Sequence, residues 1–140
     1  MIRKYPLLLL CIFLLTVQLF SAQKNMVFFG SFNYDQNKDG ISVYELDAAS
    51  GKMTKKSSLK GILNPSFLTV SKDGKYVYAC TESKTKNGGK VSSFRYHEDT
   101  GTLTWINSQG SGGENPVYLS VNDEQTYLIN GNYSGGSVSV

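Results

Sequence analysis

The feature that most constrains this chain is an internal repeat with a period of about 50 residues. The Asn-Pro pair at 64–65 recurs at 115–116, and Gly51 recurs as Gly101. A third copy begins near Gly136 and covers only a few residues. Each copy is made only of strand-length pieces. A repeat of this length and content predicts the blades of a β-propeller.

Each repeat divides into four strand-length pieces separated by polar or glycine-bearing turns. Consecutive apolar residues, such as those at 76–78, interrupt the in-out alternation of a half-exposed strand. A blade explains such runs, because both of its faces pack on neighbouring blades. We therefore predict an all-β fold of four-stranded antiparallel blades. The predicted strands are 25–30, 41–46, 53–59, 66–71, 75–81, 91–96, 103–108, 117–122 and 126–132.

The order of the pieces predicts how much of a propeller the sequence covers. In the usual strand order the piece after each Asn-Pro pair is innermost, which makes 25–30 the second strand of its blade. The sequence then covers about two and a half blades, whereas closed propellers have about four to eight. We expect 23–140 to be the N-terminal part of a truncated propeller domain, whose missing C-terminus completes the first blade. An incomplete ring would expose apolar blade faces that favour aggregation.

Residues 1–22 have the composition of a secretory signal peptide. Arg3 and Lys4 precede an apolar run at 7–20, and the small residues at 21–22 offer a cleavage site. The apolar run is short for a permanent membrane helix. We expect export to the periplasm or the extracellular space, with no stable membrane anchor after cleavage. The alternative is an uncleaved anchor.

Charge and aromatic content exclude two classes of protein. The formal net charge is +3, and two of the basic side chains, Arg3 and Lys4, lie in the predicted leader. The part of the chain that follows the predicted leader has a net charge near zero and no run of basic residues, which argues against a nucleic-acid partner. Nine tyrosines and seven phenylalanines supply the apolar bulk that disordered chains lack.

Three stretches of the sequence carry a resemblance to a known family. They are NPSFLTVSKDGKYVYACTES from residue 64, NPVYLSV from 115 and NGNYSGGSVSV from 130. Together with DTGTL at 99–103, these motifs resemble the bacterial 6-phosphogluconolactonase-like family of seven-bladed β-propellers, which includes fungal carboxymuconate cyclase relatives. The similarity extends over 26–140. Members of this family are more than twice as long, which agrees with a truncated sequence.

The resemblance implies a lactonase, a hydrolase that opens a sugar lactone with water. Such a reaction needs a general base for the water and donors for the developing oxyanion. The resemblance places the site at the mouth of the central channel, with a small-molecule lactone or sugar as partner. We expect no cofactor and no metal. The family's usual catalytic His and Arg lie beyond the NYSGG motif, so we expect 23–140 alone to be inactive.

Two features depart from the family pattern. Export is unusual for an enzyme of phosphorylated sugars, so the substrate can be a different lactone. Thr81 and Glu82 stand where relatives often have an Asn-Glu pair. A second hypothesis is therefore a non-catalytic exported propeller that binds an extracellular glycan or protein. The oligomeric state stays open.

Five residues are candidates for the functional site. Glu82 ends the second strand of a blade and is the candidate catalytic carboxylate at the channel mouth; the alternative is a solvated loop acid. We expect Asn115, Tyr118, Asn132 and Tyr133 to bind substrate. The alternatives are a structural turn for Asn115, blade packing for Tyr118, and ordinary hairpin geometry for the pair near the Gly-Gly turn.

Other motifs are expected to be structural. The proline after Asn64 and Asn115 predicts an extended backbone at both asparagines. The stretch 35–40 imitates the start of a calcium loop, but it lacks the acid at the twelfth position and the flanking helices, which favours a hairpin loop. The glycine-rich 110–113 lacks nucleotide-binding spacing and is expected to be a loop. Cys80, the one cysteine beyond the leader, is expected to be a small buried residue rather than a nucleophile.

Overall fold

The computed structural model describes residues 25–82 and 88–140, which form ten β-strands. The predicted signal peptide at 1–22 lies outside these residues. Within the described part of the chain, no helix is long and apolar enough to cross a membrane. The strands are β1 (Asn25–Gly30), β2 (Ile41–Leu46), β3 (Met53–Leu59), β4 (Phe67–Val70), β5 (Tyr76–Thr81), β6 (Lys90–His97), β7 (Thr102–Gly110), β8 (Pro116–Val121), β9 (Leu128–Asn132) and β10 (Ser137–Ser139).

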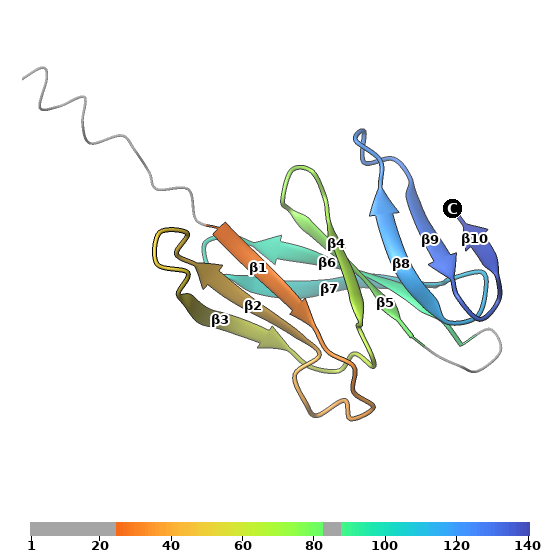
Figure 1. Cartoon of the computed structure of the whole chain (residues 1–140), viewed down its shortest axis with the longest axis horizontal. Coiled ribbons are helices and arrows are strands. Elements are labelled where there is room, and N and C mark those ends of the chain that lie inside the picture. Colours follow the sequence, from red (N-terminus) through yellow and green to blue (C-terminus); the bar gives the residue numbers. More distant parts are fainter. Residues whose placement is uncertain (1–24, 83–87) are drawn as a thin grey trace, which may run out of the picture.

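The strands form three antiparallel sheets (Figure 1). The first sheet has the order β1-β2-β3, the second β4-β5-β6-β7 and the third β10-β9-β8. The second sheet is a complete four-stranded meander. The first sheet corresponds to its second, third and fourth strands, and the third sheet to its first three strands. The predicted all-β architecture of propeller blades is confirmed.

All predicted strand bounds agree with the observed ones to within two residues. The strand β9 starts two residues later than predicted, because a side chain accepts hydrogen bonds from two backbone amides that the prediction assigned to the strand. The N–H groups of Thr126 and Tyr127 donate to Asn122 Oδ1 at 2.9 and 2.8 Å. The local turn therefore holds these residues, and the strand begins at Leu128.

Irregularities of the backbone also recur at equivalent positions in the two copies of the repeat. Pairing is interrupted at 43–44 between β2 and β3, and at 93–94 between β6 and β7. Gly51 and Gly101 close the turns beyond these strands with φ of 71° and 69°. Each glycine donates its N–H to the carbonyl oxygen four residues earlier at 2.8 Å. Only glycine adopts this left-handed conformation without steric cost, which explains why both copies of the repeat have glycine at this position of the turn.

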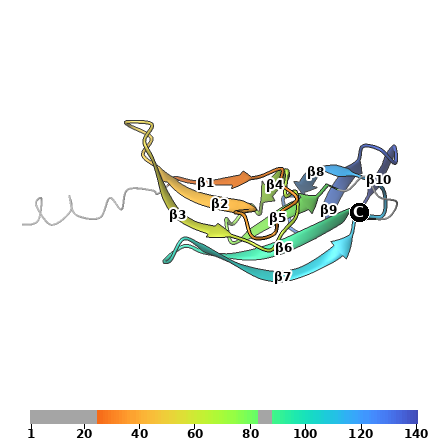
Figure 2. The ribbon, with the colours of Figure 1, turned by 90° about the horizontal axis from the view of Figure 1, so that it is seen from below.

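The main core lies between the first and second sheets. Figure 2 shows the first sheet lying over the β6 and β7 part of the second. The rings of Phe28 and Tyr96 pack edge-on across this interface, with centroids 5.1 Å apart. Burying a large apolar side chain contributes about 1.5–3 kcal/mol, so this layer stabilises the pair of blades. Its buried members are Ile41, Ile62, Ala79 and Phe94.

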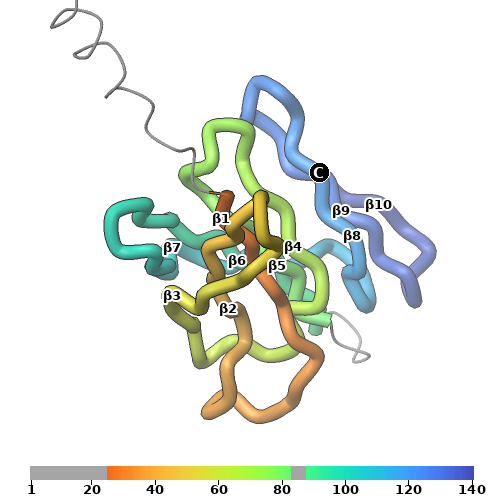
Figure 3. Tube along the Cα trace, turned by 60° about the vertical axis from the view of Figure 1, so that its left-hand side comes forward, coloured from red at the N-terminus to blue at the C-terminus, as the bar shows by residue number. Residues whose placement is uncertain are grey.

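The third sheet packs on the second through the two inner strands. β8 lies beside β4 and β5 (Figure 3), and Leu119 on β8 is buried. The Phe67 and Tyr118 rings, which occupy equivalent positions of β4 and β8, lie 5.0 Å apart. Consecutive Asn-Pro-headed strands are therefore neighbours in space, as a propeller requires.

Apolar side chains are exposed on the outward faces of the first and third sheets. On the first sheet, Phe29 is 44% exposed and packs edge-on against Tyr44. On the third, the strand register places Tyr118, Ile129 and Val138 on one face, all exposed. Beyond the innermost strand β8, these faces have the composition of blade surfaces that pack on further blades.

Candidate functional site

The candidate site lies at one end of the blades, which we call the loop face. It comprises the β1–β2 hairpin loop 31–40, the connections 60–66 and 111–115, Glu82, and the turn 133–136. The inner strands β4 and β8 begin here, and β5 and β9 end here. In Figure 1 the β1–β2 loop marks this end at the bottom of the view, while the β4–β5 and β8–β9 turns lie at the top.

The two Asn-Pro pairs form the same junction in both copies of the repeat. The Asn64 carbonyl accepts the N–H of Glu82 at 3.2 Å, and the Asn115 carbonyl accepts the N–H of Tyr133 at 2.9 Å. The prediction of an extended backbone at these asparagines is wrong, because their φ values are 42° and 58°. Proline disfavours only the right-handed helical region for the residue before it, and asparagine tolerates the left-handed region better than most residues.

Glu82 follows β5 directly, and its side chain is fixed by the start of the inner strand. Ser66 Oγ donates a hydrogen bond to Glu82 Oε1. Asn64 Nδ2 donates to the Glu82 carbonyl at 3.4 Å. A half-buried carboxylate held in this way is oriented and can accept a proton from a water molecule. Sequence reasoning missed Ser66, because its partner lies 16 residues away on a neighbouring strand.

A pocket of about 710 Å³ opens beside Glu82, between the first and second sheets. Its walls combine charged, amide and aromatic side chains from both sheets. This volume lies in the range of small-molecule sites, about 300–1,000 Å³. The lining includes Tyr34, Lys60, Asn64, Glu82, Lys90 and Trp105.

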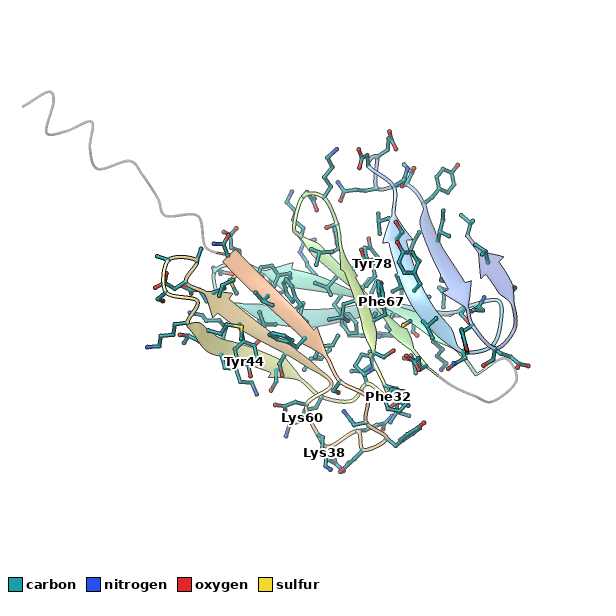
Figure 4. All side chains as sticks on the ribbon, in the orientation of Figure 1. Phe32, Lys38, Tyr44, Lys60, Phe67 and Tyr78 are labelled. Carbon is teal, nitrogen blue, oxygen red and sulfur yellow. The ribbon has the colours of Figure 1, made fainter. Side chains whose placement is uncertain are left out.

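Tyr118 and Tyr133 are the most accessible of the predicted substrate-binding residues. Tyr118 lies on β8, 54% exposed, with its ring against Phe67. Figure 4 places Phe67 and Tyr78 between β4 and β8. Tyr133, 78% exposed, follows β9 at the position that Glu82 occupies after β5.

Asn115 and Asn132 lie deeper than the two tyrosines. Asn115 is 8% exposed and Asn132 is 2% exposed. The Asn132 amide donates to the Ser111 carbonyl and to Ser137 Oγ, both at 3.2 Å, while its oxygen accepts from Asn130 at 3.0 Å. Asn132 thus links β9 and β10 to the connection before β8. Among the described residues, no hydrogen bond joins Glu82 to any of the four predicted binding residues.

Three motifs expected to be structural have structural surroundings. The loop 35–40 is the β1–β2 hairpin loop, and Lys55 Nζ lies 2.7 Å from Asp39 Oδ2. This hydrogen bond lowers the pKa of Asp39 below its ordinary value. Of the glycine-rich 110–113, Gly110 is the last residue of β7, and 111–113 lie in the connection to β8, which has no regular structure. Cys80 is fully buried, and burial raises the pKa of its thiol, as expected for a packed cysteine.

His97 ends β6 at the far end of the blade from the loop face, where Nε2 lies 2.9 Å from Thr104 Oγ1. Within 25–82 and 88–140, no group of three or more His, Cys, Asp or Glu side chains is arranged to hold a metal ion.

With this geometry established, comparison with known proteins identifies the family. Residues 26–140 match the family described as Lactonase, 7-bladed beta-propeller. The chain belongs to this lactonase family. The resemblance inferred from the Asn-Pro and NYSGG motifs is therefore confirmed.

Curated members of the lactonase family include two bacterial relatives of this chain. The 6-phosphogluconolactonase of Formosa agariphila is 34% identical over 113 residues, covering 81% of this chain and 32% of the relative. The 6-phosphogluconolactonase of Bacillus subtilis is 26% identical over 102 residues, covering 73% of this chain and 29% of the relative. The chain thus spans about a third of the length of the relatives it matches.

Solved structures of lactonase-family proteins share the arrangement of the three sheets. A candidate 6-phosphogluconolactonase from Bacteroides fragilis superposes with a TM-score of 0.75 at 30% identity, covering 85% of this chain and 32% of that one. The periplasmic gluconolactonase of Pseudomonas aeruginosa gives a TM-score of 0.65 at 25% identity, covering 76% of this chain and 30% of that one. The fold of this chain therefore matches about a third of each of these structures.

Proposed function

We propose that the protein is a sugar-lactone hydrolase in which Glu82 acts as general base. One observation carries the proposal: in a lactonase-family chain, Ser66 orients the Glu82 carboxylate at the loop face, beside an open pocket. Glu82 accepts a proton from water while the water oxygen attacks the lactone carbonyl carbon. The ring C–O bond then breaks, and the departing oxygen takes up a proton. The product is the open hydroxy acid.

The remaining predicted residues have distinct parts in this proposal. Tyr118 and Tyr133 present exposed hydroxyl groups that can hydrogen-bond the sugar. Asn115 lies next to them at the start of β8 and supplies an amide at the channel mouth. Asn132 holds the loop 111–115 through its hydrogen bonds, and so acts on substrate through the position of Asn115.

We propose export and an unphosphorylated lactone as substrate. The basic and apolar pattern of residues 1–22 supports export, and one relative of similar fold is named as a periplasmic gluconolactonase. Other relatives are named as 6-phosphogluconolactonases. Hydrolysis of the phosphorylated lactone should therefore be measured beside hydrolysis of the unphosphorylated one. A fusion of residues 1–22 to alkaline phosphatase, active only after export, tests the leader. Leu9→Arg in the apolar run should abolish its activity.

Catalysis is best tested in a complete ring. A chimera replaces the matched segment of the Formosa agariphila relative with residues 26–140 of this chain. In it, Glu82→Gln should lower kcat for gluconolactone by about 100-fold or more, the usual contribution of a general base. Glu98→Gln, in the β6–β7 turn away from the loop face, serves as the matched control and should leave kcat unchanged. Equal activity of the Glu82→Gln chimera would remove Glu82 from the mechanism.

The second hypothesis is a non-catalytic propeller that binds an extracellular glycan or protein. The exposed aromatic side chains Phe32 and Tyr34 on the loop face favour it, because such rings are common in recognition surfaces. A folded chimera that binds gluconolactone without hydrolysing it would support this hypothesis over the first.

A further inference from the structure

We infer that the pocket between the first and second sheets is a binding site for a short saccharide carrying a carboxylate. This site adjoins the proposed catalytic carboxylate, since Glu82 is one of its lining residues, but it extends away from Glu82 along the connection 60–63 and the outer strands β6 and β7. Binding there requires no turnover, so the inference goes beyond the proposed lactonase activity.

The two sheets leave room for a ligand at the loop face while they touch at the opposite end. There, Ser57 Oγ on β3 donates to the Gly101 carbonyl at 2.6 Å, which ties the outer strands together. At the loop face, Ile62 and Leu63 form one wall of the pocket, and Ser92 and Ser108 form another. The volume of about 710 Å³ exceeds what one sugar ring occupies.

Aromatic side chains supply a flat surface in this pocket. Trp105 on β7 is 59% exposed although its cross-strand partner Phe94 is buried. Tyr34, 71% exposed, reaches the pocket from the β1–β2 loop. Large aromatic rings provide apolar contact for the C–H faces of a sugar ring, and an exposed tryptophan beside a polar cavity is typical of ligand sites.

Asn64 provides an unused hydrogen-bond acceptor. Its side chain is 1% exposed and lines the pocket, and within the described residues its Oδ1 atom has no hydrogen-bond partner. Leaving a buried acceptor unpaired is costly, because the atom has lost its hydrogen bonds to bulk water, so such atoms in native proteins usually have a ligand or water partner. A sugar hydroxyl is a donor of suitable size.

The charged side chains of the pocket favour a ligand that carries a carboxylate. Lys60 and Lys90 contribute two ammonium groups, against one carboxylate from Glu82. Figure 4 shows Lys60 on the loop face, near the β1–β2 loop. Two cations and a ring-stacking surface fit a saccharide with a carboxylate better than a neutral sugar.

Binding is measured on the full 140-residue chain, in which Trp105 is the single tryptophan and reports its own site by fluorescence. Titration with D-glucuronate should quench Trp105 emission saturably, whereas D-glucose, which lacks the carboxylate, should bind about tenfold more weakly or worse. D-glucose 6-phosphate is the third probe. Tighter binding of the phosphate would overturn the carboxylate assignment, and equal binding of glucose would overturn selection by charge.

Variants locate the site by calorimetry. Trp105→Ala should abolish the heat of D-glucuronate binding, and because Trp105 is exposed, this variant should keep the unfolding midpoint of the wild type. Lys60→Gln should weaken binding about fivefold. Lys72→Gln is the matched control at the far end of the blade, and its affinity should stay within about twofold.

Glu82→Gln separates this inference from the proposed function. Removing the carboxylate should tighten D-glucuronate binding about threefold, although the same change should abolish hydrolysis in the chimera. The same titrations in the chimera, followed by calorimetry, test the site where the blade faces are covered. Absence of saturable binding in both proteins, with folding confirmed by circular dichroism, would overturn the inference.

Discussion

At the scale of single residues, the two copies of the repeat differ where they meet different neighbours. The first copy has Ile62 and Ala79 in the apolar core, while the second has Gly113 and Asn130 at the equivalent positions. A side chain at Gly113 would meet the Asn132 amide nitrogen at 2.5 Å. The second junction is therefore built from amide hydrogen bonds rather than from apolar packing. Because Gly113 has no side chain where the first copy has Ile62, the Asn132 amide can occupy that space.

The positive φ of the Asn-Pro junction predicts a specific stability effect. Asn115→Ala should lower the free energy of unfolding by about 1–2 kcal/mol, because alanine is strained in the left-handed region. Asn115→Gly should cost less, since glycine adopts this region freely. Urea unfolding of the three proteins gives the comparison. Equal losses in both variants would mean that the Asn115 side chain, not the backbone, stabilises the junction.

The hydrogen bond between Asp39 and Lys55 predicts a pH-dependent effect. The folded-state pKa of Asp39 is lowered chiefly by this bond, so the charged carboxylate stabilises the fold above the ordinary pKa of 3.8. That contribution is lost as the pH falls through the folded-state pKa. Asp39→Asn should therefore melt at a lower temperature than the wild type at pH 7, and the difference should close below pH 3.8.

Salt provides the control for this effect. Both side chains are partly exposed, so 1 M NaCl should reduce the difference in melting temperature at pH 7. A difference that persists unchanged at pH 2 would assign the effect of Asp39→Asn to the loop hydrogen bonds rather than to charge.

At the scale of elements, the sequence was sufficient to predict the strands and their order. The period, the glycine turns and the runs of consecutive apolar residues are local signals, and they correctly predicted the four-stranded second sheet. The pocket could not be predicted in this way. It combines Tyr34, Lys60, Lys90 and Trp105 from different sheets, and only the relative placement of the blades brings them together. The unpaired Asn64 oxygen is likewise a property of packing.

Phe94 tests the layer between the first two sheets. It is 1% exposed at the centre of the core, so Phe94→Ala should lower the free energy of unfolding by about 3–5 kcal/mol. Phe32→Ala removes another phenyl ring, from a residue that is 57% exposed, and should change the free energy of unfolding by no more than about 0.5 kcal/mol. Chemical denaturation of the wild type and the two variants measures these free energies of unfolding. Similar losses in the two variants would contradict the placement of the core.

At the scale of the whole molecule, the lactonase family supplies the context for the exposed blade faces. The chain spans about a third of the curated relatives it matches, and it belongs to a family of seven-bladed propellers. Ile129 and Val138 then occupy positions where, in a closed ring, a further blade would pack. The site proposed at Glu82 uses only one part of such a ring, which is why the expected activity belongs to a complete propeller rather than to 23–140 alone.

The most direct test of this account is the activity of the unsubstituted chimera, in which residues 26–140 replace the matched third of the Formosa agariphila relative. If these residues are interchangeable lactonase blades, the chimera should be folded, and its kcat/KM for 6-phosphogluconolactone hydrolysis should lie within about tenfold of the parent enzyme, a barrier change of about 1.4 kcal/mol. A folded chimera with no lactone hydrolysis above the uncatalysed rate would contradict the account.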